Sequence, residues 1–247
     1  MELHFQLLLL FGVGLVAGFI NVMAGGGSAI AMPILIFMGL DGALANGTNR
    51  LAIFIQNISA ILSFRQEKVS EFRLSFKMAI FALPGAILGA ILAVNIDSDV
   101  FKKILGVIII GIIITTIIPK KAKNIDTKPK RPWLIYPVMF AIGFYGGFMQ
   151  IGVGFIIIAA LQNILKLGLV RVNMHKVFII FLYNLPALIV FILNRDVKWE
   201  FGLVLATGNA LGAWISAKVS VRRGEKFIRI VLIIALGIIS FELFDLF

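Results

Sequence analysis

The chain has 247 residues, of which 60% are hydrophobic and only 14% are charged, and its formal net charge is +11. A soluble domain carries about 25% charged residues, so this composition excludes an ordinary cytosolic enzyme, a disordered protein and a nucleic-acid-binding domain. The chain has no cysteine and two histidines, which excludes thiolate metal sites and disfavours a histidine-based one. We therefore expect a lipid bilayer as the environment, no nucleic-acid partner and no cofactor.

About eight apolar segments follow one another along the chain. The opening run, Phe5–Met38, carries no charge and is longer than a signal peptide core, so we expect it to be retained. The runs are continuous rather than alternating, and some need flanking residues such as Arg50 and Arg229 to complete a span. They predict an all-α integral membrane protein. The later runs are Leu51–Phe64, Met78–Val94, Ile104–Ile118, Trp133–Leu165, Val177–Leu193, Phe201–Ala217 and Ile230–Phe241.

The two halves of the chain match each other at a fixed offset of 127 residues. Paired glycines and asparagines at one offset indicate a duplication rather than chance matching of apolar helices. We predict a first membrane repeat at residues 1–118, a basic cytoplasmic linker at 119–132 and a second membrane repeat at 133–247. The matching pairs include Gly25 with Gly152, Gly27 with Gly154, Asn46 with Asn173, Asn57 with Asn184, and Gly85-Ala86 with Gly212-Ala213.

Each repeat opens with a run that glycines break near its middle, at Gly25-Gly26-Gly27 and at Gly152-Val153-Gly154. If every segment crossed the membrane once, the basic residues would divide twelve to eleven between the two sides. If each broken run is a hairpin that returns to its own side, 18 basic residues lie inside and five outside, as the positive-inside rule requires. The sequence therefore predicts two inverted repeats, each a glycine-broken hairpin followed by three transmembrane helices.

The glycine breaks are the first candidate for a binding site. A helix that starts at Ser28 would direct free N–H groups and its positive dipole end at the first break, which suits an anion. Gln150, Gly152 and Gly154 form the counterpart in the second half. The alternative is that these glycines only allow close helix packing.

A second polar group follows each break. The motif Asn46-Gly47-Thr48-Asn49-Arg50 is expected to start the next helix, with Arg50 and Lys176 at the edges of the site. This motif either belongs to the site or is a helix cap with an arginine that reaches the interface. Asn57 and Asn184, 11 residues further along the same helix face, either join helices or line the path. His175 is either a proton relay or an interface residue. The predicted substrate-binding residues are Gly25, Gly26, Gly27, Ser28, Asn46, Thr48, Asn49, Arg50, Asn57, Gln150, Gly152, Gly154, Asn173, His175, Lys176 and Asn184.

Other mechanisms find no support in the sequence. No Gly-x-x-x-x-Gly-Lys-Ser/Thr motif occurs, so this chain alone does not drive transport with ATP. No Asp or Glu stands in the middle of a span, which disfavours a carboxylate-based cation pump. No nucleophile motif or carboxylate pair supports an enzyme, and none is expected.

Several of these motifs, taken together, resemble the TauE/SafE family of sulfite and sulfonate exporters, also known as DUF81 or TSUP. The resemblance covers nearly the whole chain and both repeats. The second half lacks the middle glycine, where Val153 stands, and a proline matching Pro33. The motifs are Gly18-x6-Gly25-Gly-Gly-x5-Pro33, Ala45-Asn-Gly-Thr-Asn49, Pro84-Gly-Ala-x2-Gly89-Ala, Gly152-x-Gly154, Asn173-x2-Lys176, Asp196-Val-Lys-Trp-Glu-x-Gly202 and Gly208-x3-Gly212-Ala.

This resemblance implies a permease for small, often sulfur-containing anions such as sulfite, thiosulfate or organosulfonates in the cytoplasmic membrane of a prokaryote. From the residues we expect a secondary transporter of a small anion, working by alternating access around a glycine-rich site at the membrane midplane. An anion channel with the same polar residues and a membrane scaffold that uses them only for packing remain alternatives. Assembly into a homo-oligomer is left open.

Overall fold

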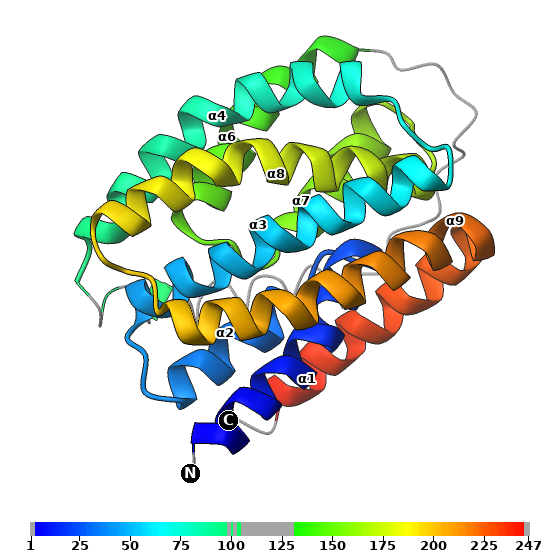
Figure 1. Ribbon diagram of the computed structural model, residues 1–247. Coiled ribbons are helices and arrows are strands. Elements are labelled where there is room, and N and C mark those ends of the chain that lie inside the picture. The colour runs from blue at the N-terminus through cyan, green and yellow to red at the C-terminus, as the bar shows by residue number, and fades with distance from the viewer. Residues whose placement is uncertain (1–2, 98–99, 101–102, 105–130, 245–247) are drawn as a thin grey trace.

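The computed structural model describes residues 3–97, 100, 103–104 and 131–244, and this part of the chain is helical, without strands (Figure 1). Side chains are described up to residue 232 and at 234. The predicted linker lies outside the described residues except for its last two positions, as does nearly all of the apolar run Ile104–Ile118.

The helices of the two halves follow the same order. The first half contains α1 (Leu3–Met23), α2 (Ser28–Phe37), α3 (Gly42–Gln66) and α4 (Phe72–Asn95). The second half contains a 3-10 turn, η1 (Pro132–Leu134), and then α6 (Ile135–Phe148), α7 (Val153–Ile164), α8 (Leu169–Leu193) and α9 (Trp199–Phe244). Helix α9 bends at Gly224, which has a φ of 70°, so that its two arms run back along each other (Figure 1).

The boundaries of the helices repeat at the offset found in the sequence. Helices α3 and α8 have 25 residues each and begin 127 positions apart, and so do the starts of α4 and α9. Gly25 and Gly152, also 127 positions apart, both have a positive φ and lie in the breaks between α1 and α2 and between α6 and α7. The expected helix start at Ser28 is confirmed.

The expected start of the following helix is wrong. Helix α3 begins at Gly42, and the side chain of its N-cap residue, Asp41, accepts a hydrogen bond from the backbone N–H of Leu44 at 2.9 Å. Asn46 therefore lies in the second turn of α3. The Asn46–Arg50 motif belongs to the helix interior and is not a cap.

Glycines allow the first helix of each half to pack closely against a helix of the other half. Helix α1 lies against the first arm of α9, where a Cβ on Gly18 would lie 2.2 Å from the carbonyl oxygen of Asn209. Helix α6 lies against α4, where a Cβ on Gly85 would lie 2.2 Å from the carbonyl oxygen of Phe140. Larger residues at Gly18 or Gly85 would push the backbones apart, as at small-residue interfaces of membrane helices.

Polarity is distributed as in a membrane protein, with large apolar side chains exposed on the outside and two charged side chains buried inside. Leu8, Phe37 and Leu193 are 69%, 85% and 76% exposed, whereas Arg50 and Lys176 are fully buried. Among the described helices three are long and apolar enough to cross a membrane, and others are shorter apolar helices. The three long segments are His4–Met23, Phe72–Asn95 and Leu169–Leu193.

Different contacts join the helices at the two ends of the bundle. At one end Arg222 donates to Glu67 at 2.9 Å and Arg171 pairs with Glu71, which joins the α3–α4 loop to the start of α8 and to the end of the first arm of α9. At the other end the backbone N–H of Lys198 donates to Thr48 Oγ1 at 3.0 Å. The N-terminal start of α1 lies at this second end (Figure 1).

Candidate functional site

The two glycine breaks meet in the centre of the bundle. A Cβ on Gly25 would lie 2.5 Å from the carbonyl carbon of Gly154, and a Cβ on Gly154 would lie 2.4 Å from the Cα of Gly25. Gly25 also has a φ of 96°, which side chains disfavour. Only glycine at both positions lets the two backbones touch.

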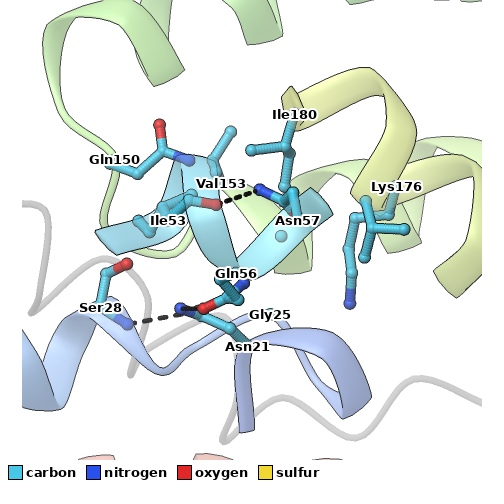
Figure 2. A pocket seen from close by; sticks show the side chains of 12 residues that line it. Asn21, Gly25, Ser28, Ile53, Gln56, Asn57, Gln150, Val153, Lys176 and Ile180 are labelled. Atoms are coloured by element: carbon cyan, nitrogen blue, oxygen red, sulfur yellow. Dashed lines mark hydrogen bonds between the residues drawn. The ribbon is translucent and has the colours of Figure 1, made fainter. Parts of the chain in front are cut away.

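A small cavity lies beside this contact (Figure 2). Its volume is about 10 Å³, close to the room that one water molecule needs. Both breaks and helices α3 and α8 contribute to its wall, so each half of the chain supplies part of it. The lining residues are Asn21, Gly25, Ser28, Ile53, Gln56, Asn57, Gln150, Val153, Gly154, Lys176, Val177 and Ile180.

Lys176 is the charged residue of the cavity wall. It is fully buried, and its Nζ donates to the carbonyl oxygen of Val22 at 2.8 Å and to Asn173 Oδ1 at 2.9 Å. No carboxylate within the described residues forms an ion pair with it. An ammonium group has three N–H donors, and these two bonds use two of them.

Arg50 is also fully buried, but its guanidinium group binds the end of another helix. Its Nη2 donates to the carbonyl oxygens of Gly146 and Gly147 at 2.9 and 2.5 Å, and its Nη1 donates to Asn184 Oδ1 at 3.3 Å. These carbonyls end α6, where the helix dipole is negative and carbonyl groups lack helical partners. The expectation that Arg50 reaches the membrane interface is therefore wrong, since its side chain is buried and binds the end of α6. Its place at the edge of the site stays a prediction.

The backbone N–H group at the start of α2 has a different partner from the one expected. The backbone N–H of Ser28 donates to Asn21 Oδ1 at 3.3 Å, and Asn21 Nδ2 in turn donates to Gln56 Oε1 at 3.1 Å. Figure 2 shows this chain of side chains from α1 to α3 at one side of the cavity. A side chain of the protein thus occupies the N–H group that was expected to face an anion.

The sixteen predicted site residues fall into two groups. The cavity brings together Gly25, Ser28, Asn57, Gln150, Gly154 and Lys176. The other ten residues do not line it: Gly26, Gly27 and Gly152 lie in the breaks, and Asn46, Thr48, Asn49, Arg50, Asn173, His175 and Asn184 lie along α3 and α8.

Several residues of the second group join helices. Asn46 Nδ2 donates to the carbonyl oxygen of Phe148, and Asn184 Nδ2 to that of Arg50. His175 Nδ1 lies 2.7 Å from Ser75 Oγ of α4, which directs the ring away from the cavity wall. No group of three or more His, Asp or Glu residues that could hold a metal ion occurs in the described part of the chain.

Sequence reasoning missed Asn21, Gln56 and Tyr183. Gln56 accepts from Asn21, while Tyr183 Oη lies 3.4 Å from Gln150 Oε1 as its donor. Gln56 and Tyr183 stand 127 positions apart. A search for polar pairs of any type at this offset would have found them, whereas a search for identical residues did not.

Comparison with known proteins finds relatives over nearly the whole chain. The model of the family described as "Sulfite exporter TauE/SafE" matches residues 10–243. A probable membrane transporter protein of Haemophilus influenzae is 32% identical over 95% of this chain and 93% of its own length. The probable membrane transporter proteins YfcA of Escherichia coli and YunE of Bacillus subtilis are 29% and 24% identical, over 95% and 90% of this chain and 88% and 93% of their own lengths. No solved structure matches.

These relatives are named transporters, not enzymes. The apolar exterior and the helices of spanning length are those of a multi-pass membrane protein. The match extends through both halves, including the breaks at Gly25 and Gly154. The chain belongs to the TauE/SafE sulfite exporter family of membrane transporters.

Proposed function

We propose that this protein is a secondary transporter of small anions, with sulfur-containing oxyanions or organosulfonates as substrates, and that the central cavity is its substrate site. One observation carries the proposal: Lys176, fully buried in the cavity wall, has no carboxylate partner within the described residues. A buried cation without a counter-ion is costly in a low-dielectric interior. A bound anion supplies the missing charge.

The neutral polar side chains of the cavity wall also suit an anionic substrate. The amides of Asn21, Gln56 and Gln150 and the hydroxyl of Ser28 offer donors to an oxyanion, and the wall contains no carboxylate that would repel it. The family match gives sulfite as the first substrate to test. A cation would meet Lys176 instead of oxygen ligands.

Inverted repeats would give this site alternating access. In each half the first helix packs against a helix of the other half through the same kind of glycine contact: α1 packs against the first arm of α9, and α6 packs against α4. Equivalent contacts of this kind in the two halves support a two-fold relation between them. Rocking of one half against the other would open the cavity to either end in turn.

The size of the cavity favours this mechanism over an open channel. A site with room for about one water molecule cannot hold sulfite without widening. On this proposal a substrate must move the two halves apart to enter. A permanently open anion channel would need a continuous polar path instead.

Flux measurements on the purified protein in proteoliposomes test the proposal. Labelled sulfite, thiosulfate, a sulfonate and a carboxylate are offered with and without a proton or sodium gradient. A transporter accumulates at least one sulfur oxyanion against its gradient. Flux that only dissipates gradients would identify a channel, and no flux of any anion from a folded protein would identify a scaffold.

A further inference from the structure

We infer that the cavity selects a monoanion that carries its own hydrogen-bond donor, such as hydrogen sulfite or a hydroxy-sulfonate, over a dianion or a sulfonate without a donor. The inference rests on the proposed function and deepens it. Two features of the wall carry it: its single positive charge, and a buried acceptor, Asn57 Oδ1, that accepts no hydrogen bond from the described residues.

The charge of the wall comes from one residue. The position equivalent to Lys176 in the first half is Asn49, 127 residues earlier, which is neutral. Arg50, its neighbour, does not line the cavity and is bound to the end of α6. One cation neutralises one negative charge, and a dianion would keep a second charge buried without a partner.

The acceptor is Asn57, which is 1% exposed. Its Nδ2 donates to the carbonyl oxygen of Ile53 one turn earlier at 2.9 Å, which fixes the orientation of the amide (Figure 2). Its Oδ1 therefore remains as an acceptor, and a buried acceptor without a donor is unfavourable. A ligand with an O–H or N–H group satisfies it, whereas a fully deprotonated oxyanion cannot.

The two features lie in the wall of one cavity, so one ligand can meet both. Its negative oxygens would take the remaining N–H of Lys176, and its hydroxyl would donate to Asn57 Oδ1. A metal cation is disfavoured at this acceptor because Lys176 lines the same cavity. Hydrogen sulfite combines the single charge and the hydroxyl in one compact ion.

A matched pair of substrates isolates the donor. Ethanesulfonate and 2-hydroxyethanesulfonate are both monoanions and differ in one hydroxyl group, and a single pH keeps the protonation of the protein constant. We expect the wild-type protein in proteoliposomes to take up the hydroxy compound with a roughly tenfold lower KM. Sulfate, a dianion, should compete poorly with both.

The variant Asn57→Leu removes the acceptor at similar volume. The KM ratio of the two sulfonates, both measured on this variant, should then fall to about one. The matched control is Asn209→Leu, since Asn209 is a fully buried asparagine whose side-chain amide also lacks a partner in the described chain but does not line the cavity. This control should keep the wild-type ratio.

The outcomes separate the inference from the proposed function. Uptake of both sulfonates with equal KM in the wild-type protein, or a ratio that Asn57→Leu leaves unchanged, would overturn the donor requirement and leave the anion transporter standing. Strong competition by sulfate would overturn the monoanion preference. Absence of uptake of sulfite and of both sulfonates by a folded protein would overturn the proposed function, and this inference with it.

Discussion

Asn46 and Asn173 stand 127 residues apart and each holds the end of the other half's first helix. Asn46 Nδ2 in α3 donates to the carbonyl oxygen of Phe148, the last residue of α6, at 2.8 Å. Asn173 Nδ2 in α8 donates to the carbonyl oxygen of Met23, the last residue of α1, at 3.0 Å. Each bond gives a donor to the carbonyl of a last helical residue, next to a glycine break.

Replacing either asparagine by alanine should therefore destabilise the protein by a similar amount. Asn46→Ala leaves the Phe148 carbonyl without this donor, and Asn173→Ala does the same to Met23, at about 1–3 kcal/mol each. Reversible unfolding in mixed micelles measures the free energy of unfolding of each variant.

The control for this pair is Asn163→Ala, because Asn163 is exposed and donates to the carbonyl oxygen of Ala159 in its own helix. This change should stay within about 0.5 kcal/mol. A loss of stability in only one of the two buried variants would contradict the reciprocal arrangement.

Gly154→Ala tests the contact between the breaks. The new Cβ would lie 2.4 Å from the Cα of Gly25, a backbone atom that cannot turn aside. We expect a loss of about 1–3 kcal/mol from overpacking and a strong loss of sulfite uptake. Gly12→Ala in α1 is the control, since nothing lies within 4 Å of the added atom. Normal stability and uptake in Gly154→Ala would mean that the two breaks do not touch.

Lys176 and Arg50 should respond differently to replacement by methionine. Lys176→Met removes the charge of the cavity wall and should weaken anion binding by about 1–2 kcal/mol, roughly a five- to thirty-fold rise in KM. Arg50→Met instead leaves the carbonyls of Gly146 and Gly147 without donors, so its main effect should be on stability, by about 1–3 kcal/mol. Uptake kinetics and thermal unfolding in detergent, measured on both variants, separate the two roles. Equal effects of the two changes on KM would contradict the separation.

The duplication made the breaks and much of the helix order predictable. Paired glycines at one offset located both breaks, and the start of α2 followed from Ser28. The position of Arg50 could not be predicted, because its partners are carbonyl groups at the end of α6, about a hundred positions further along the chain. Those carbonyl groups accept from Arg50 because α6 ends at the glycine break of the second half. No sequence pattern near Arg50 indicates this contact.

The start of α3 was missed for a related reason. Asn46 and Asn49 look like capping residues, since asparagine favours helix ends. Here Asn46 is tolerated inside the helix because its amide reaches another helix. The actual cap, Asp41, was the available local signal. At the site, the search for identical residues found Asn57 and Asn184 but passed over Gln56.

The carboxyl group of Asp196, at the end of the bundle that holds the N-terminus, makes the stability of the protein depend on pH. It lies in the α8–α9 loop, outside the spanning segments, and partial burial and the nearby Asp41 raise its pKa. A raised carboxyl pKa means that the folded state binds the proton more tightly than the unfolded state. Stability from this group therefore increases as the pH falls through the raised pKa, and is lost above it.

Asp196→Asn should raise the melting temperature slightly at neutral pH and reduce its dependence on pH in the acidic range. The effect should shrink in high salt, because the repulsion between partly exposed carboxylates is screened. Thermal unfolding at a series of pH values measures it. A lower melting temperature of Asp196→Asn at neutral pH would show that the charged form is favourable and would contradict the interpretation.

The sidedness of the two halves can be measured directly, because the native chain has no cysteine. Single cysteines are introduced at Ser70 and Arg223, which lie at the end of the bundle where Arg222 pairs with Glu67, and at Asn194 and Glu200, at the end that holds the N-terminus. All four positions are exposed.

If the 18 basic residues lie inside, an impermeant maleimide should label Asn194→Cys and Glu200→Cys in intact cells. Ser70→Cys and Arg223→Cys should react only after the membrane is opened. Because Ser70 belongs to the first half and Arg223 to the second, protection of both is expected only if the halves insert with opposite orientation. Labelling of Ser70 and Glu200 from the same side would exclude the inverted repeats and, with them, the proposed alternating access.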